Sequence, residues 1–232
     1  MVKSNAISAM KANRLYWLGR YEERVYMTLH LLRQCYDRMI DGDTADYEEF
    51  WQKLDASGSY SSPDEFRLGM LYDTKNPNSI ISEINFAKDN AILLREDITS
   101  ETLSFIEMSI AHMNKCKAEV ETNITTLQPI TDWSLAFWGS VFQRLHNPKI
   151  ISLIVIGRNV EYMDMLIRFG YPFDRIRQSY EAVKAYGKDV KRIFDTVIES
   201  QLDYLLTAEQ YNPSDMEYRN KVLKFINQLV LV

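Results

Sequence analysis

The stretch Leu15-Tyr16-Trp17-Leu18-Gly19-Arg20-Tyr21-Glu22-Glu23-Arg24 decides the fold, because it places charged residues inside an apolar helical segment. On a helical wheel, with about 100° per residue, one broad apolar stripe consists of Leu15, Leu18, Val25, Leu29, Leu32 and Tyr36. Arg20 points to the opposite side, with Glu23 and Arg24 beside it. The other residues on that side are apolar or aromatic, namely Tyr16, Trp17, Met27 and Leu31. A helix that is apolar on both sides is typical of a buried helix, so this segment predicts a central helix with charges in the core.

A second stretch repeats the pattern Gly-Arg-x-x-Glu in a similar setting. It reads Leu153-Ile154-Val155-Ile156-Gly157-Arg158-Asn159-Val160-Glu161-Tyr162. Corresponding positions keep their character in the pairs Tyr16/Ile154, Trp17/Val155, Met27/Met165 and Leu31/Phe169. We interpret the two stretches as an internal repeat of one motif helix. Each glycine removes a side chain beside the arginine and so permits another helix to approach closely, at a cost in helix propensity.

The charged residues of the two stretches can pair in two ways. Within one helix, residues three apart share a face, so Arg20 can meet Glu23, and Arg158 can meet Glu161. If the two helices instead pack around a local two-fold axis, the pairs cross: Arg20 reaches Glu161, and Arg158 reaches Glu23. We hypothesise the crossed arrangement.

Two interpretations of this charge cluster stay open. In the first it is a buried ionic network that fixes the register of the bundle, and breaking one pair then costs roughly 3–5 kcal/mol. In the second, Arg20, Arg24 and Arg158 form an anion-binding cleft, because the rigid fork of arginine suits carboxylate and phosphate. Tyr162 stands where the first copy has Arg24, so such a cleft would be asymmetric.

Start and stop signals divide the rest of the chain into helices, and no segment shows a sustained alternation of apolar and polar residues. The sequence therefore predicts an all-α fold, with residues 1–232 forming a single domain, a multi-helix bundle of about eight to ten helices. A loop is expected at 56–61, and Pro129 is expected to end a long helix. The expected helices cover about 8–40, 44–54, 62 onward, 77–97, 99–126, 133–145, 148–170, 173–186, 188–208 and 214–229.

Composition and charge exclude several classes of protein. The net charge of −5 argues against general nucleic-acid binding, which needs a basic face. The N-terminus lacks the apolar stretch of a signal peptide, and the longest apolar run, Ile150 to Ile156, is too short to cross a bilayer. Cys35 and Cys116 form no CxxC pair and fit small core residues in a reducing compartment. We therefore expect a cytoplasmic protein without a membrane span.

Metal, thiol and nucleotide chemistry find little support in the sequence. None of the histidines, His30, His112 and His146, follows a glutamate by three residues, as ligands in a helical di-iron site do. No base stands out that could activate a cysteine. No glycine-rich nucleotide motif is present, so any ATP-dependent step would belong to a partner. We expect no metal and no cofactor.

These residues resemble those of the alpha-E domain family, helical bacterial proteins named for a Glu-Arg signature. The phrase from Asn13 to Arg24 resembles the opening motif of the family. A second block, at 76–80, 87–91 and 95–101, resembles it as well, and Gly157-Arg158-x-x-Glu161 resembles the internal second motif. Tyr162 departs from the usual Glu-Arg ending of that motif. The resemblance extends from residue 8 to about residue 170.

The resemblance implies a functional context and a set of positions. Members of the family tend to be encoded or fused with circularly permuted ATP-grasp ligases and transglutaminase-like proteins, which implies a role in peptide ligation or peptide modification. The positions that the resemblance singles out are Arg20, Glu23, Arg24, Asn90, Arg95, Glu101, Arg158 and Glu161.

Our leading hypothesis is a non-catalytic accessory protein. It would bind and position an anionic peptide or aminoacyl ligand, or an ATP-grasp-type ligase partner, through the motif helices. The alternative is an amide-forming or group-transfer enzyme that uses the arginines as clamps and Glu23 or Glu161 as base. A third interpretation is a structural bundle that forms homo-oligomers. A binding role requires the motif face to open onto a cleft, whereas a structural role requires carboxylates to seal the arginines.

Overall fold

A computed structural model describes residues 7–40, 46–54, 60–119 and 123–232. These residues form eleven α-helices and one short 3-10 helix, and only an isolated bridge between Phe194 and Val230 has β character. The expected all-α fold is therefore confirmed, with one helix more than the eight to ten expected. The helices are α1 (Ala9–Ile40), α2 (Asp46–Lys53), α3 (Pro63–Tyr72), α4 (Ile80–Leu93), α5 (Arg95–Ile98), α6 (Ser100–Ala118), η1 (Ile124–Leu127), α7 (Gln128–Arg144), α8 (Pro148–Arg168), α9 (Phe173–Gly187), α10 (Thr196–Leu205) and α11 (Met216–Gln228).

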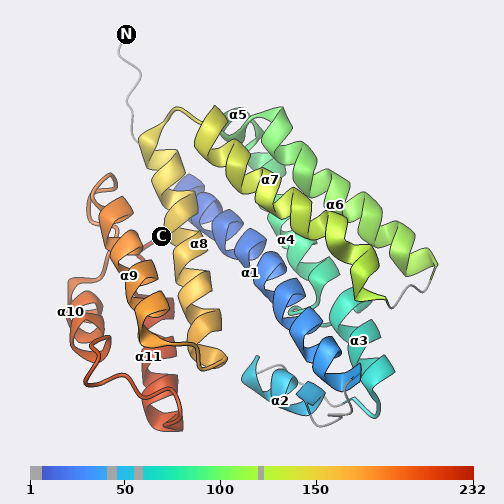
Figure 1. The fold of residues 1–232 in the computed structure, drawn as a ribbon. Helices are drawn as coiled ribbons and strands as arrows, with labels where there is room; N and C mark the ends of the chain where they lie inside the picture. Colours follow the sequence, from blue (N-terminus) through green and yellow to red (C-terminus); the bar gives the residue numbers. More distant parts are fainter. Residues whose placement is uncertain (1–6, 41–45, 55–59, 120–122) are drawn as a thin grey trace.

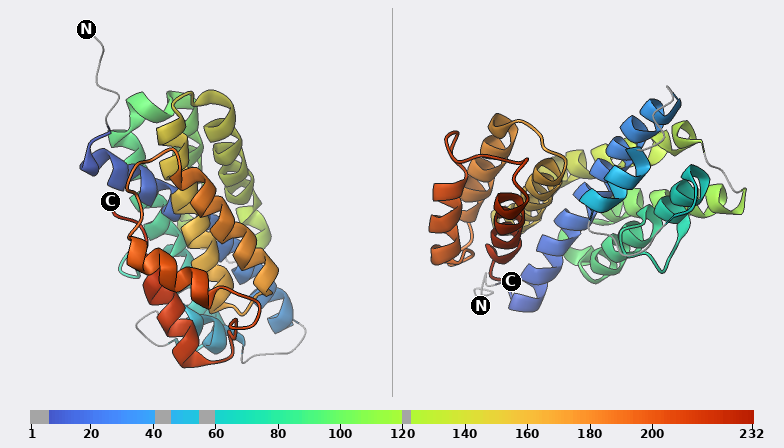
Figure 2. Two further views of the ribbon diagram at one scale, coloured as in Figure 1. Left: turned by 90° about the vertical axis from the view of Figure 1, so that its left-hand side faces the viewer. Right: turned by 90° about the horizontal axis from the view of Figure 1, so that it is seen from below.

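The two helices that carry the Gly-Arg-x-x-Glu stretches, α1 and α8, lie in the middle of the molecule and pack on each other more extensively than any other pair. On one side, α4 and α7 cover α1, with α6 packed on α4 and α7, and on the other side α9 and α11 cover α8 (Figures 1 and 2). This placement confirms that both motif helices are central. It also explains their apolar character on both sides, because each has neighbours in more than one direction.

Local capping signals begin these helices where the sequence places them. The hydroxyl of Ser8 accepts a hydrogen bond from the backbone N–H of Lys11 at the start of α1. At the start of α8 the side chain of Asn147 accepts from the N–H of Lys149, and Pro148 occupies the first turn. The hydroxyl of Ser62 accepts from the N–H of Glu65 at the start of α3. Each cap satisfies an N–H group that the helix itself leaves without a partner.

Two of the expected boundaries in the middle of the chain are wrong. The long helix expected to reach residue 126 ends at Ala118, and a separate 3-10 turn follows after Asn123, whose side chain accepts from the N–H of Thr125. Asparagine competes in this way with the helical hydrogen bonds. Pro129 does not end a helix but lies in the first turn of α7, where its missing N–H has no consequence.

The helix expected over 77–97 is two helices, α4 and α5. Ser79 rather than Pro77 marks its beginning, because the Ser79 hydroxyl accepts from the N–H of Ser82. Upstream, Asn76 forms a turn in which its side chain accepts from the N–H of Asn78. The side-chain turn at Asn76 and the cap at Ser79 together delay the start of the helix.

The C-terminal boundaries differ for a tertiary reason. A helix expected from 188 begins only at Thr196, since backbone hydrogen bonds tie the preceding segment to the C-terminus: Asp195 N to Leu229 O at 2.9 Å and Leu231 N to Ile193 O at 2.8 Å. Asp215, not Ser214, caps α11 by accepting from the N–H of Glu217. The expected helix start at residue 44 and most of the expected loop at 56–61 lie outside the described residues.

Within the described ranges, none of the helices combines the length and the apolar character that a bilayer crossing demands. Cys35 and Cys116 are both buried.

Candidate functional site

The helices α1 and α8 cross at their two glycines. A Cβ atom on Gly19 would lie 2.0 Å from the carbonyl oxygen of Ile154, and a Cβ atom on Gly157 would lie 2.0 Å from the carbonyl oxygen of Tyr16. Both distances are far inside van der Waals contact, so only glycine fits at either position. The two contacts join corresponding positions of the two stretches, as a local two-fold axis would. The close approach brings the neighbouring arginines of each helix within reach of the other helix.

The charged side chains pair across this crossing. Nε of Arg20 donates to Oε2 of Glu161 at 2.7 Å, and Nε of Arg158 donates to Oε2 of Glu23 at 3.0 Å. This is the hypothesised crossed arrangement, and pairing within one helix is not what the structure shows. The reciprocal contacts describe the packing of two helices, and the interpretation of the stretches as an internal repeat stays a prediction.

One half of the crossing is almost entirely buried, and we call it the sealed half. Arg24 donates to both oxygens of Glu161, through Nε to Oε1 and through Nη2 to Oε2 at 2.9 Å, so Glu161 is held by two arginines. The remaining Nη1 of Arg24 donates to Oε1 of Glu83 on α4 at 3.0 Å. The guanidinium of Arg20 lies 4.9 Å from the centre of the Trp17 ring. The side chains of Arg20 and Glu161 are only 4% and 1% exposed, so this half functions as part of the core.

Electrostatics in the sealed half follow from the count of arginines around each carboxylate. Burial alone would raise the pKa of Glu161, but Arg24 and Arg20 outweigh burial and hold the pKa at about 2. Burial raises the pKa of Glu83 to about 7 against the opposing effect of Arg24, and repulsion by Glu161 adds to the increase. Oε2 of Glu83 is buried without a hydrogen-bond partner. Glu161 is therefore the fixed anion of the network, and Glu83 is a carboxyl group close to its protonation point at neutral pH.

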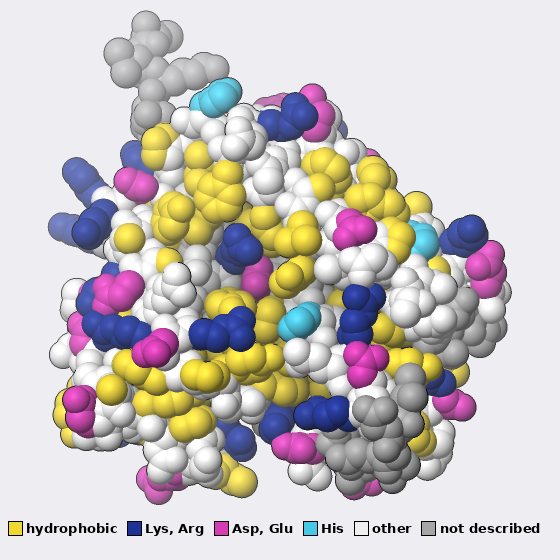
Figure 3. All heavy atoms as spheres, viewed as in Figure 1, with side chains coloured by type: hydrophobic (Ala, Val, Ile, Leu, Met, Phe, Trp, Pro, Cys, Tyr) yellow, Lys and Arg dark blue, Asp and Glu magenta, His cyan; other side chains and the backbone are white. Residues whose placement is uncertain are grey.

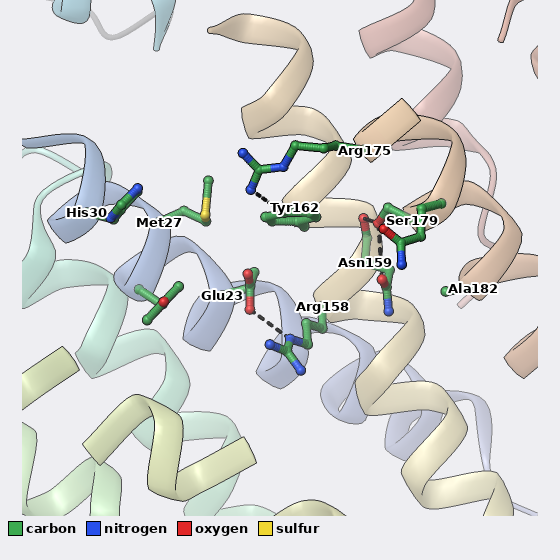
Figure 4. A pocket seen from close by; sticks show the side chains of 11 residues that line it. Glu23, Met27, His30, Arg158, Asn159, Tyr162, Arg175, Ser179 and Ala182 are labelled. Atoms are coloured by element: carbon green, nitrogen blue, oxygen red, sulfur yellow. Dashed lines mark hydrogen bonds and ion pairs between the residues drawn. The ribbon is translucent and has the colours of Figure 1, made fainter. Parts of the chain in front are cut away.

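The other half of the crossing opens onto a pocket of about 530 Å³ between α1, α8 and α9. Figure 4 shows Glu23, Met27 and His30 on α1 facing Arg158, Asn159 and Tyr162 on α8, with Arg175, Ser179 and Ala182 added by α9. Tyr26 and Gln178 complete the lining. On the face drawn in Figure 3, Lys and Arg side chains and a histidine lie among apolar side chains near the middle of the molecule. This pocket is our candidate functional site.

Arg158 is positioned at the floor of the pocket by two partners. Its Nε donates to Glu23, and its guanidinium lies 4.4 Å from the centre of the Trp138 ring on α7. Its side chain is 31% exposed, and no hydrogen bond from its two η nitrogens is found among the described residues. The outer edge of this guanidinium is therefore available to a ligand.

A second arginine comes from α9. Arg175 donates through Nη2 to the hydroxyl of Tyr162, and its guanidinium lies 4.8 Å from the centre of the Tyr171 ring. Tyr162 occupies the position that corresponds to Arg24 in the first stretch. The open half thus has a tyrosine in place of the half-buried Arg24 and obtains its second positive charge from another helix.

The carboxyl groups of the open half are less firmly ionised than Glu161. Burial raises the pKa of Glu23 to about 7 against the opposing effect of Arg158. Burial, with a further contribution from Glu23, raises the pKa of Glu22 to about 8. No ion pair or hydrogen bond of the Glu22 side chain is found among the described residues. The pocket therefore contains two arginines and one carboxyl group, Glu23, whose pKa is raised to about 7.

The structure brings together five of the eight positions that the sequence singles out and leaves three apart. Arg20, Glu23, Arg24, Arg158 and Glu161 meet at the crossing, but the three arginines do not line one cleft. Arg158 lines the large pocket, Arg24 and Glu161 line a separate polar pocket of about 100 Å³, and Arg20 lines neither. Arg95 and Glu101 are exposed near the junction of α5 and α6, where Glu101 lies 3.9 Å from Arg144. Asn90, on α4, lines neither pocket.

Sequence reasoning missed Glu83 and Arg175. Glu83 carried a signal, because a glutamate between Ile81 and Ile84 on the buried stripe of a helix needs a positive partner. Arg175 carried none, since it lies on an amphipathic helix together with two other basic residues, Arg177 and Lys184, which have acidic partners elsewhere. Only the packing of α9 against α8 makes it a pocket residue.

No group of three or more His, Cys, Asp or Glu side chains that could hold a metal ion occurs among residues 7–40, 46–54, 60–119 and 123–232.

Fold and site together define a class: an all-helical protein whose two central helices cross at paired glycines and exchange arginine–glutamate pairs. The model of the Alpha-E family, described as a predicted alpha-helical domain with a conserved ER motif, matches residues 8–214. The chain belongs to the Alpha-E family. Glu23-Arg24 is the only Glu-Arg dipeptide in the sequence, which places the ER motif at the crossing, one residue in each half. The comparison with curated proteins found no match, and neither did the comparison with solved structures.

Proposed function

We propose that this protein is a non-catalytic binding module that holds the anionic end of a peptide or aminoacyl ligand in the pocket between α1, α8 and α9. The observation that supports this proposal best is the pair Arg158 and Arg175, whose guanidinium groups line one pocket and keep N–H groups without a protein acceptor among the described residues. Arginine binds carboxylate and phosphate through two parallel hydrogen bonds, and both side chains are braced against aromatic rings.

The size and composition of the pocket support a small ligand rather than a protein surface. A volume of about 530 Å³ falls in the range of roughly 300–1,000 Å³ that small-molecule sites occupy. The walls formed by Tyr26, Met27 and Tyr162 offer apolar contact beside the charges. Such a site fits a ligand with one anionic group and an apolar body.

We further propose that the module works with an ATP-grasp-type ligase in a peptide-ligation or peptide-modification system. The support for this partner is the family context alone: alpha-E proteins resemble one another in being encoded or fused with such ligases. Size-exclusion chromatography of the chain mixed with the ATP-grasp-type ligase of its own genome tests the proposal. A shared peak supports the partnership, and two independent peaks with and without ATP contradict it.

The binding proposal is tested by titration calorimetry with N-acetyl-L-phenylalanine, which carries a carboxylate and an apolar body but no free amine, and with inorganic phosphate. We expect the protein to bind at least one of them, and we expect Arg158→Gln and Arg175→Gln each to weaken that binding at least tenfold, because each removes a charged donor.

Arg144→Gln is the matched control, since Arg144 is an exposed arginine of α7 outside the pocket and its removal changes the net charge equally. Circular dichroism of each variant separates loss of binding from loss of fold. Equal binding by the wild type and both pocket variants would contradict the proposal, as would no binding of either probe.

One observation favours a second candidate, an amide-forming or group-transfer enzyme. The carboxyl group of Glu23 has a pKa of about 7 and lines the same pocket as the two arginines, and a general base is most effective with a pKa near the working pH. In such a reaction the amine nitrogen of one substrate attacks the carbonyl carbon of an acyl phosphate. The C–N bond forms, the C–O bond to phosphate breaks, phosphate leaves with the electron pair, and Glu23 takes the amine proton.

Incubation of the protein with acetyl phosphate and L-phenylalanine tests this candidate. Formation of N-acetyl-L-phenylalanine above the uncatalysed rate by the wild type, and its loss in Glu23→Gln, would support an enzyme. Product at the uncatalysed rate in both samples leaves the binding module as the function.

A further inference from the structure

The pocket presents not only positive charge but also a carboxylate in direct contact with one of its arginines. Oε2 of Glu23 accepts from Nε of Arg158 at 3.0 Å, and no hydrogen bond from the described residues reaches the other oxygen of Glu23. Among the residues that the structure describes, the η nitrogens of Arg158 have no acceptor either. Both members of this ion pair line the pocket, and each has spare hydrogen-bonding capacity.

A purely anionic ligand fits this arrangement poorly. An anion on the outer edge of Arg158 would approach the carboxylate of Glu23, and like charges in a partly buried site repel each other. A ligand that carries an ammonium group next to its carboxylate removes the conflict, because its ammonium group can face Glu23 while its carboxylate faces Arg158.

The rest of the lining fits the same chemistry. Asn159 and Ser179 are occupied with each other and with backbone carbonyls, so they do not compete for the charged groups of a ligand. Arg175 adds positive charge to the α9 side of the pocket, next to Tyr162 (Figure 4). Tyr26 and Met27, which adjoin Glu23 on α1, form the apolar wall that a side chain on the α-carbon would meet.

We propose that the pocket between α1, α8 and α9 binds a free α-amino acid with an apolar side chain, its ammonium group on Glu23 and its carboxylate on Arg158. This inference rests on the proposed binding function and narrows its ligand from an anion to a zwitterion. It assigns to Glu23 of the ER motif the task of recognising an amine.

Titration calorimetry with three related probes tests the inference: L-phenylalanine, N-acetyl-L-phenylalanine and L-phenylalaninamide. The second probe lacks the ammonium group, and the third lacks the carboxylate. We expect L-phenylalanine to bind at least tenfold more tightly than either derivative, because each derivative leaves one charged group of the site without a partner.

Glu23→Gln sharpens the test. The variant should weaken the binding of L-phenylalanine at least tenfold and leave the binding of N-acetyl-L-phenylalanine unchanged or tighter, because the repelling carboxylate is gone. Glu101→Gln is the matched control, since Glu101 is an exposed glutamate outside the pocket, and it should bind all probes as the wild type does.

The outcomes separate this inference from the proposed function. Equal binding of L-phenylalanine and its N-acetyl derivative would overturn the proposal of a zwitterionic ligand and leave the proposed anion-binding function in place. Unchanged binding of L-phenylalanine by Glu23→Gln would also overturn it. Binding of L-phenylalaninamide as tight as that of L-phenylalanine, or no binding of any probe including phosphate, would overturn both.

Discussion

The two halves of the α1–α8 crossing start from the same short sequence pattern and end in opposite environments. In the sealed half two arginines hold Glu161, and every charged group has a partner inside the core. In the open half one arginine holds Glu23, Tyr162 replaces the second arginine, and a pocket adjoins the pair. The comparison teaches that similar sequence patterns can end in a buried ion network or in an accessible one, depending on the side chains that neighbouring helices add.

The ratio of arginines to carboxylates sets the physical difference between the halves. Two guanidinium groups overcome the cost of burying Glu161 and keep its pKa at about 2, whereas one guanidinium group leaves the pKa of Glu23 at about 7. A carboxylate locked at a low pKa contributes to stability, while one that titrates near neutral pH can exchange its partner for a ligand.

The largest expected effect is that of removing the fixed anion. Glu161→Gln should lower the free energy of unfolding by about 3–5 kcal/mol, because Arg20 and Arg24 lose the charge that balances them, and the amide N–H₂ cannot accept from them. Urea denaturation measures this loss. The same substitution in the other half, Glu23→Gln, should cost less than about 1 kcal/mol, because that carboxyl group is already easily neutralised. Equal losses would break the comparison between the halves.

The crossing itself is tested at its glycines. Gly157→Ala should destabilise the protein by about 3 kcal/mol, since the new methyl group would meet the backbone carbonyl of Tyr16, which cannot move without shifting α1. Thermal unfolding followed by circular dichroism measures the change. Gly139→Ala, on the exposed side of α7 with no atom within 4 Å of its Cβ position, should instead stabilise by about 0.5–1 kcal/mol through helix propensity. A tolerated Gly157→Ala would contradict the contact at the crossing.

The stability of the protein should depend on pH, because several buried carboxyl groups have raised pKa values in the folded state. Glu22 has a pKa of about 8 in the folded protein, above its ordinary value of 4.5, so between these values the folded state holds a proton that the unfolded state has released. Stability from this group is therefore full below pH 4.5 and is lost as pH rises toward 8. Glu23 and Glu83 act in the same direction up to about pH 7, and Glu161 acts oppositely below pH 4.5.

Glu22→Gln isolates the largest of these shifts. The variant should lose less stability than the wild type between pH 5 and pH 8, by on the order of 1–2 kcal/mol, because glutamine does not titrate. Urea denaturation at both pH values gives the comparison. The prediction is wrong if the two proteins show the same pH dependence.

The smallest expected loss of stability is that of Arg158, the arginine of the crossing that lines the large pocket. Arg158→Gln should cost at most about 1 kcal/mol in the free energy of unfolding, because its side chain is 31% exposed and Glu23 can take up a proton when its partner is gone. Arg20→Gln should cost clearly more, since it removes a buried partner of Glu161. Urea denaturation of the two variants ranks them, and the reverse order would show that the open half also stabilises the fold.

Much of the fold could be predicted because it depends on local chemistry. The apolar surroundings of Arg20 and Arg158 identified two buried helices, and Ser8, Ser62 and Asn147 marked helix starts that the structure confirms. The boundary before α10 failed because distant segments meet there: its start depends on hydrogen bonds between the segment before it and the C-terminus. The residues around position 190 give no local signal of this pairing with the C-terminus.

By itself the sequence determined the all-helical fold, the two central helices and the identity of the charged residues at their crossing. Helical periodicity can be read from the chain alone, and a buried arginine needs an acidic partner, of which the apolar stretches offer few. The tertiary structure alone decided which arginine is sealed and which lines a pocket. That outcome depends on Glu83 from α4 and Arg175 from α9, and electrostatic pairing acts through space, at distances that the order of residues along the chain does not encode.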